Sequence, residues 1–232
     1  MTDTYKEGDV IYIKTDDGYH VNKILKVDEQ GTFHVLTYEP ISRKPKEKDL
    51  KELTVSCYHA PIASLSDSEF LTNIPVKEED LEGYLEYLKM TDFKKYVEET
   101  GQDMDEIIER ATEEFQRGND LAEDGEFEEA LLHYTETIQL FPLFYEALDN
   151  RGLTYMGLKK LDLAILDFND SLEINPDGIV AAFSLGECFY KLGKFQKALE
   201  QFERSVELES DNPLCTEWLE KTKERMKNGK SA

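Results

Sequence analysis

The sequence predicts an α+β protein, in which a small N-terminal antiparallel β-barrel is followed by an all-α superhelix. Short runs rich in Val, Ile, Tyr and Phe occur before residue 65, helical spacing of apolar residues begins after it, and a fixed period runs through the C-terminal half. A chain of 232 residues is long enough for two domains. We expect the barrel over residues 1–63, a helical connector over 64–102 and the helical domain over 103–232.

Three runs form the strands of the expected barrel: DVIYIKT, YHVNKILKV and TFHVLTYEPI. Turn signals rich in Asp and Gly separate them at residues 16–18 and 28–31, which is typical of hairpins. In the first run Val10 and Tyr12 alternate with Ile11 and Ile13, as in a half-buried strand. We expect a further strand at residues 54–58 and a solvated loop over the charged residues 43–51.

The opening of this region, Glu7-Gly8-Asp9-Val10 followed by Asp17-Gly18, resembles an SH3-like or Tudor-like barrel. Tudor-type barrels can cage methylated cations with aromatic rings, a role that the resemblance would give to several rings here. The alternative, which we favour, is that these rings are ordinary barrel core and rim. The rings are Tyr5, Tyr12, Tyr19, Phe33 and Tyr38.

The connector carries helical signals from Ser66 onward. Ser66 and Glu69 match a capping box, a pattern typical of a helix N-terminus. Apolar residues at i, i+3, i+4 and i+7 follow, and Gly101 suits a helix C-terminal cap. These apolar residues are Leu81, Tyr84, Leu85 and Leu88.

The C-terminal half repeats itself every 34 residues, because Ala130, Ala164 and Ala198 are spaced by that interval (164 − 130 and 198 − 164). Glycines, aromatic residues and prolines recur in phase with the alanines. They are Gly118, Gly152 and Gly186, then Tyr134, Phe168 and Phe202, and finally Pro142 and Pro176.

This pattern resembles the tetratricopeptide repeat (TPR), in which small residues allow two helices to touch, aromatic residues fill the gap and proline ends the second helix. The resemblance implies a TPR superhelix with repeats at about residues 111–144, 145–178 and 179–212. It also implies a capping helix at residues 213–227. We expect Trp218 on that helix to seal the last repeat rather than to anchor a partner.

In TPR proteins the first helix of each pair lines a concave groove, so the resemblance implies a peptide-binding site here. Helical periodicity places apolar, amide and carboxylate side chains on that face. The candidate groove residues are Phe115, Asn119, Glu123, Asp149, Asn150, Leu153, Met156, Phe183, Glu187 and Tyr190.

One TPR subgroup uses lysines, an arginine and two asparagines to hold the acidic C-terminus of heat-shock chaperones. Asn119 and Asn150 match the two asparagines, whereas Phe115, Val180 and Ser184 replace the cations. Without cations nothing offsets the desolvation of a doubly charged terminus, so we expect a protein or peptide with apolar anchors and neutral or basic flanks.

Two alternatives stay open for these groove residues. The asparagines could be structural amides that bond a neighbouring helix, and the apolar residues could pack on the capping helix or on a second copy. A homo-oligomer therefore stays open, as does a groove filled internally by the connector around Leu81–Leu88. In both cases the protein would be structural rather than an adaptor.

Charge and composition argue against other functions. A net charge of −23 repels nucleic acid and anionic membranes, and no apolar run is long enough for a spanning helix. Without a targeting signal and with three cysteines in no ligand pattern, we expect a cytoplasmic protein with no cofactor. We do not expect an enzyme, and the spacing of Cys57 and His59 argues against a zinc site with His20 and His34.

Overall fold

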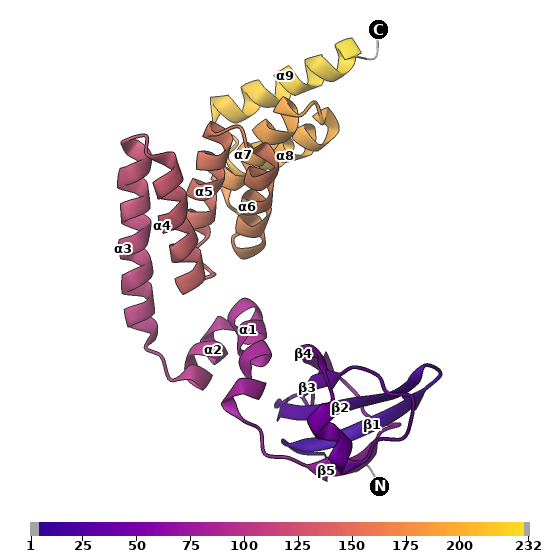
Figure 1. Cartoon of the computed structure of the whole chain (residues 1–232). Coiled ribbons are helices and arrows are strands. Elements are labelled where there is room, and N and C mark those ends of the chain that lie inside the picture. Colours follow the sequence, from indigo (N-terminus) through magenta and orange to yellow (C-terminus); the bar gives the residue numbers. More distant parts are fainter. Residues whose placement is uncertain (1–4, 230–232) are drawn as a thin grey trace. The chain divides into compact units, whose positions relative to one another are not determined.

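The computed structural model describes residues 5–229 and divides the chain into two compact units, one up to Gly101 and one from Gln102 onward. The first unit contains a five-stranded sheet and two helices, and the second contains helices (Figure 1).

An antiparallel sheet with strand order β4-β3-β2-β1-β5 forms the centre of the first unit. Buried apolar side chains such as Ile11, Ile24 and Val35 make its core, as the strand alternation predicts. Short 3-10 helices occupy Glu47–Glu52 and Glu78–Asp80. The strands are β1 (Asp9–Thr15), β2 (Gly18–Val27), β3 (Phe33–Tyr38), β4 (Val55–Ile62) and β5 (Glu69–Asn73). The likeness of this sheet to an SH3 barrel stays a prediction.

The sheet extends past residue 63, so the helix start expected at Ser66 is wrong. Glu69 begins β5, which pairs antiparallel with β1, with Asp9 opposite Asn73. A capping box is a local pattern, and here pairing with a strand far away in the sequence overrides it. The loop over residues 43–51 also differs from expectation, because buried Asp49 accepts hydrogen bonds from Arg43 and the backbone of Lys46 and so fixes its 3-10 helix.

Helices α1 (Glu82–Thr91) and α2 (Phe93–Thr100) complete the first unit. Tyr84 and Leu88 of α1 are buried in one cluster with Leu25 and Leu36 of the sheet, and Leu81 and Leu85 pack against that cluster. The apolar side of the connector is therefore already covered by the sheet. This argues against the alternative in which that side fills the groove.

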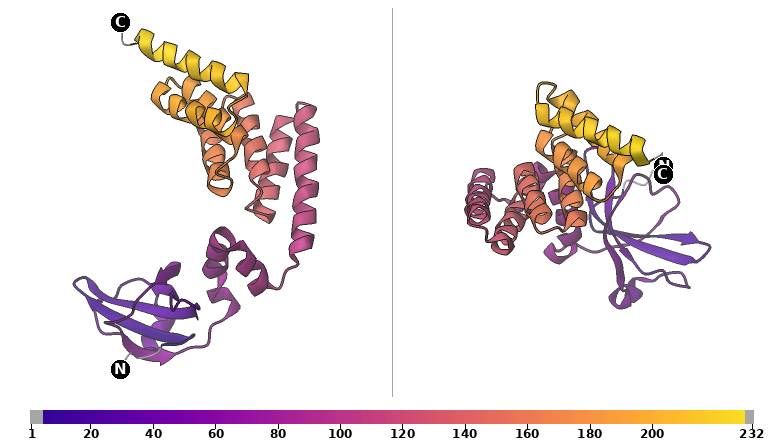
Figure 2. Two further views of the ribbon diagram at one scale, coloured as in Figure 1. Left: turned by 180° about the vertical axis from the view of Figure 1, so that it is seen from behind. Right: turned by 90° about the horizontal axis from the view of Figure 1, so that it is seen from above.

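The second unit is an array of antiparallel helix pairs, seen from two further directions in Figure 2. Each pair matches one sequence repeat, and α9 packs on the last pair. The helices are α3 (Met104–Glu123), α4 (Phe127–Leu140), α5 (Tyr145–Gly157), α6 (Leu161–Ile174), α7 (Ile179–Lys191), α8 (Phe195–Leu208) and α9 (Pro213–Gly229).

The recurring glycines and aromatic residues touch each other within each repeat, which explains the period. A Cβ on Gly152 would lie 2.7 Å from Cε1 of Phe168, closer than real side chains approach. Gly118 stands in the same relation to Tyr134, and Gly186 to Phe202, both also at 2.7 Å. The two helices of a repeat can therefore approach closely only if the first carries glycine there.

The turns between the paired helices share a left-handed residue. Gly125 and Gly193 have φ values of 82° and 72°, and Lys159 takes the equivalent place with φ 59°. Left-handed backbone costs a residue with a Cβ about 1–2 kcal/mol. The turn geometry is thus retained in the second repeat even though its glycine is replaced.

Candidate peptide-binding groove

A hollow of about 630 Å³ lies between the first two repeats, on the side formed by α3 and α5. Its walls contain four of the ten predicted groove residues: Asn119, Glu123, Asn150 and Leu153. The other lining residues are Gln116, Ala122, Phe127, Tyr134 and Thr154.

The two asparagines form one hydrogen-bonded network with Tyr134. The Tyr134 hydroxyl donates to Oδ1 of Asn119 at 2.9 Å, and Nδ2 of Asn150 donates to the same oxygen at 2.8 Å. Burial raises the pKa of Tyr134. The amides therefore link α3 to α5, as the structural reading predicts, and peptide contact by the same pair stays a prediction.

This network fixes which polar groups of the amide pair can meet a ligand. Because Oδ1 of Asn119 already accepts two hydrogen bonds, the pair offers the NH₂ group of Asn119 and the carbonyl oxygen of Asn150. Donors on Asn119 beside an acceptor on Asn150 suit a backbone peptide group, which has one donor and one acceptor.

The charge of the hollow is negative. Glu123 is exposed and lines it, whereas the lining residues include neither lysine nor arginine. The three clamp positions without a cation have different surroundings. The Phe115 ring lies 4.9 Å from that of Phe144, Ser184 is buried, and Val180 is 44% exposed.

Asp149 does not present its carboxylate to a ligand, so its predicted place in the groove is wrong. It is buried, and Ser171 of α6 donates a hydrogen bond to its Oδ1 at 2.6 Å. Burial raises the pKa of Asp149 to about 6, against 3.8 for an ordinary aspartate. Helical periodicity places this residue near the groove edge, but contact with the partner helix of the same repeat turns it inward.

Most of the predicted apolar anchors pack inside the array. Met156, Phe183 and Tyr190 lie partly buried against the core of repeats two and three. Trp218 of α9 covers two of them, with ring centroids 6.3 Å from Phe183 and 5.3 Å from Tyr190. Trp218 therefore seals the last repeat, as predicted.

Apolar side chains are exposed on the groove helices as well. Leu153 of α5 is 42% exposed and Val180 of α7 is 44% exposed. The sequence places Val180 both at a clamp position without its cation and on the apolar groove face, and its exposure leaves it available as apolar surface. Glu187, also on α7, is partly exposed and remains a candidate.

The histidines singled out in the sequence lie in the first unit. Nδ1 of His34 is 2.8 Å from Nε2 of His59, and the two rings stack at 5.1 Å. Desolvation holds the pKa of His59 down at about 4. His20 instead pairs with Asp17, and Cys57 is exposed. Within residues 5–229, no group of three or more His, Cys, Asp and Glu residues could hold a metal ion.

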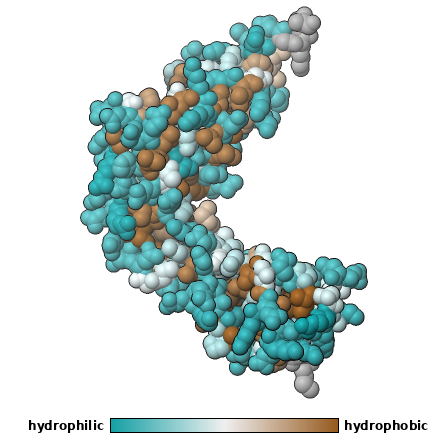
Figure 3. Space-filling model, in the orientation of Figure 1, coloured by the Kyte–Doolittle hydropathy of each residue, from teal (hydrophilic) through white to brown (hydrophobic). Residues whose placement is uncertain are grey.

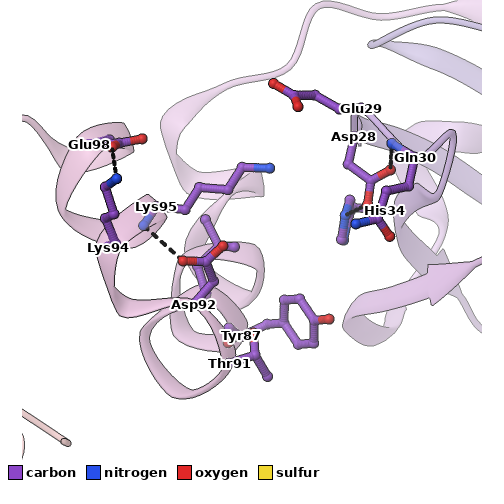
Figure 4. A pocket seen from close by; sticks show the side chains of 11 residues that line it. Asp28, Glu29, Gln30, His34, Tyr87, Thr91, Asp92, Lys94, Lys95 and Glu98 are labelled. Carbon is purple, nitrogen blue, oxygen red and sulfur yellow. Dashed lines mark hydrogen bonds and ion pairs between the residues drawn. The ribbon is translucent and has the colours of Figure 1, made fainter.

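A second hollow, of about 490 Å³, adjoins this histidine pair (Figure 4). Lys95 and Tyr87 extend from the helices toward the loop that carries Asp28. Three of its other charged groups engage one another or the backbone, since Asp92 caps α2 and Lys94 lies 3.9 Å from Glu98. These contacts are consistent with a structural seam between the sheet and its helices.

The rings considered for a cation cage do not form an open one. Tyr12 is buried, and its hydroxyl forms a hydrogen bond with Glu69. A cation of the same protein already lies over this ring, since Nζ of Lys44 is 5.1 Å from the ring centre. Tyr19 lies 6.1 Å from Tyr12, and the Tyr5 hydroxyl donates to the backbone of Ser68. These contacts support the interpretation as core and rim.

Comparison with known proteins finds tetratricopeptide repeats in the helical unit. Two family models, both described as tetratricopeptide repeat, match residues 115–179 and residues 180–212. The solved first TPR of Spaghetti (RPAP3), bound to the HSP90 peptide SRMEEVD, is 28% identical with a TM-score of 0.50, covering 51% of this chain and 94% of that one. The solved first TPR domain of human RPAP3 is 27% identical, also with a TM-score of 0.50, and covers 53% of this chain and 97% of that one.

Curated relatives match the same half of the chain. Small glutamine-rich tetratricopeptide repeat-containing protein 2 of Saccharomyces cerevisiae is 30% identical over 96 residues, 41% of this chain and 28% of that protein. Sperm-associated antigen 1 of Rattus norvegicus is 27% identical over 122 residues, 53% of this chain. The match spans only 14% of the length of the rat protein. Among residues 5–229, no helix is long and apolar enough to cross a membrane.

Proposed function

We propose that this chain, whose residues 115–212 are tetratricopeptide repeats, is a protein-interaction adaptor that binds a segment of a partner protein in its groove. The observation that carries the proposal is the hollow between repeats one and two, with its hydrogen-bonded amide pair and its exposed Leu153. We place this activity in the cytoplasm, where the three free cysteines stay reduced.

The proposed ligand has apolar anchors and neutral or basic flanks. Leu153 and Val180 offer apolar surface, the Asn119 and Asn150 amides offer a donor and an acceptor to the backbone, and Glu123 attracts a cation. This chemistry differs from that of the Spaghetti repeat, whose solved ligand SRMEEVD ends in acidic residues.

The lack of cations at the clamp positions supports this difference in ligand charge. A bound acidic terminus has to lose its hydration, and fixed positive charge is what offsets that cost. Here Phe115 packs on Phe144 and Ser184 is buried, so neither position supplies a positive charge. We therefore propose that acidic C-termini are not ligands of this groove.

A structural or self-associating role is the second candidate, and one observation favours it: α9 covers Phe183 and Tyr190. The residues that α9 covers belong to the third repeat, and none of the residues lining the hollow between the first two repeats comes from α9. The net charge of −23 also opposes association of identical copies. We therefore prefer the adaptor.

A peptide array probed with the full chain tests the proposal. The array holds seven-residue peptides with two apolar anchors and either lysine or glutamate flanks, together with SRMEEVD, the peptide bound in the Spaghetti structure. We expect the lysine-flanked peptides to be preferred, because the hollow is lined by Glu123 and by no cation. A preference for acidic segments contradicts the ligand chemistry, and binding of none of the peptides favours the structural role.

Fluorescence anisotropy with the best peptide then locates the site. Asn150→Ala removes the amide that bonds Asn119 and should weaken binding by about tenfold. Asn169→Ala is the matched control, since Asn169 is an exposed asparagine of α6 that bonds only within its own helix. Equal effects of the two substitutions place the ligand elsewhere.

A further inference from the structure

Three exposed leucines occupy the outer helices of the first two repeats. Leu132 of α4 is 70% exposed, and Leu166 and Leu163 of α6 are 59% and 42% exposed. Leu132 and Leu166 are one repeat apart (166 − 132 = 34), so they hold the same position in successive repeats. Leu163 lies three residues before Leu166 and therefore on the same side of α6.

The fold does not require leucine at this position. The third repeat has Glu200 there (200 − 166 = 34), and Glu200 is exposed. The position thus accepts a charged side chain. Single exposed leucines are ordinary on protein surfaces, but here leucine recurs at the period of the array, so equivalent positions of α4 and α6 both present an apolar side chain. Figure 3 shows hydrophobic residues reaching the surface of the helical unit among hydrophilic ones.

The exposed charged side chains of α4 and α6 are acidic. Neither α4 nor α6 contains a lysine or an arginine, whereas the equivalent α8 contains Lys197 and Arg204. The leucines therefore lie on helices whose exposed charges are all negative. These exposed carboxylates belong to Glu128, Glu129, Glu136, Asp162, Asp170 and Glu173.

We propose that the outer face of α4 and α6 is a second docking surface, which binds a basic amphipathic segment of a partner protein. Apolar side chains of the segment contact Leu132, Leu163 and Leu166, and its lysines or arginines pair with the surrounding carboxylates. A second copy of this chain would bring the same carboxylates to the contact, and an anionic membrane would be repelled. Charge thus selects a basic protein segment as the occupant.

The surface is separate from the groove, so the adaptor could hold two partners at once. The groove hollow is lined by residues of α3, α4 and α5, and these three leucines are not among them. The inference therefore stands whether or not a peptide binds between Asn119 and Asn150.

The test uses the full chain and a fluorescein-labelled helical peptide of about 18 residues, with leucine on one face and lysine on the other. A peptide of the same composition with its apolar period scrambled is the control probe. We expect saturable binding of the amphipathic peptide, with the scrambled peptide about tenfold weaker. Equal binding of both peptides would show only general attraction to an acidic protein and would overturn the proposal.

The variant L132E/L166E carries the substitution, and Leu214→Glu is its matched control, because Leu214 is a 48% exposed leucine of α9 outside both surfaces. Both variants add negative charge, which by itself strengthens attraction to lysines, so a loss of binding has to come from lost apolar contact. We expect about tenfold loss in L132E/L166E and no loss in Leu214→Glu. Unchanged binding in L132E/L166E, or equal losses in both variants, overturns the proposal.

Two further measurements test whether the double substitution disturbs folding and whether the protein self-associates. Glu200 shows that glutamate fits this position, so the fluorescence of Trp218 should report the same urea midpoint for L132E/L166E as for the wild type. Sedimentation velocity of the unliganded chain tests the other occupant. A dimer that L132E/L166E dissolves would assign the surface to a second copy instead.

Discussion

Adding one methyl group inside the second repeat should cost about 2 kcal/mol of unfolding free energy. In Gly152→Ala the new Cβ would lie 2.7, 2.9 and 3.1 Å from three ring carbons of Phe168. Phe168 is fully buried, so its ring has no free space to move into. Overpacking of this kind costs about 1–3 kcal/mol, and the better helix propensity of alanine returns about 1 kcal/mol. Because the contact is so short, we take the upper value of about 3 kcal/mol for the clash. Subtracting about 1 kcal/mol for helix propensity leaves a net cost of about 2 kcal/mol.

Gly157→Ala on the same helix is the matched control. No atom lies within 4 Å of the site where its Cβ would be, so only helix propensity acts and the variant should gain about 0.5–1 kcal/mol. The two glycine substitutions should therefore shift stability in opposite directions. Urea unfolding followed by the fluorescence of Trp218, the single tryptophan of the chain, reports the helical unit alone. A Gly152→Ala variant as stable as the wild type would refute the close-contact reasoning.

Three further predictions concern titration and backbone strain. Burial lowers the pKa of His59 to about 4, below 6.5 for an ordinary histidine, so the first unit should be most stable above about pH 6.5 and lose stability as the pH falls toward 4. Hydrogen exchange of sheet amides measures this loss, and an unchanged profile in His59→Phe would contradict it. The pKa of Asp149 is raised to about 6, against 3.8 for an ordinary aspartate, so pH affects stability in the opposite direction. The helical unit loses stability as the pH rises from about 4 to 6. Asp149→Asn should raise its urea midpoint at pH 7 but not at pH 4, and equal shifts at both would argue against it. Lys159→Gly should stabilise the same unit by about 1 kcal/mol by relieving a φ of 59°, whereas Lys159→Ala should not.

The helical half could be predicted because its main contacts lie within one repeat. Gly152 and Phe168 are close in sequence, and the same pair recurs in both neighbouring repeats. The sheet was harder to predict, since β5 is recognised only by its pairing with β1, far away along the chain. The local pattern at Ser66 and Glu69 therefore indicated a helix where the structure has a strand.

The groove shows the same division between local and distant effects. Helical periodicity placed Asn119 and Asn150 on one side of α3 and α5, and in the structure both line the hollow. It could not show that Ser171 binds Asp149, or that Trp218 covers Tyr190, because both contacts come from another helix. Periodicity assigns a residue to a face, and the neighbouring helices decide whether that face is open.

Tyr134 differs from its counterparts Phe168 and Phe202 by one hydroxyl group. Its ring fills the space beside Gly118 in the core, and its hydroxyl holds Asn119 at the groove. A ligand that draws Asn119 toward itself has to disturb a bond to a core residue, so occupancy of the groove alters the surroundings of a buried chromophore. Phenylalanine makes no such bond in repeats two and three. The first repeat is thus the one in which a core side chain is bonded directly to the groove.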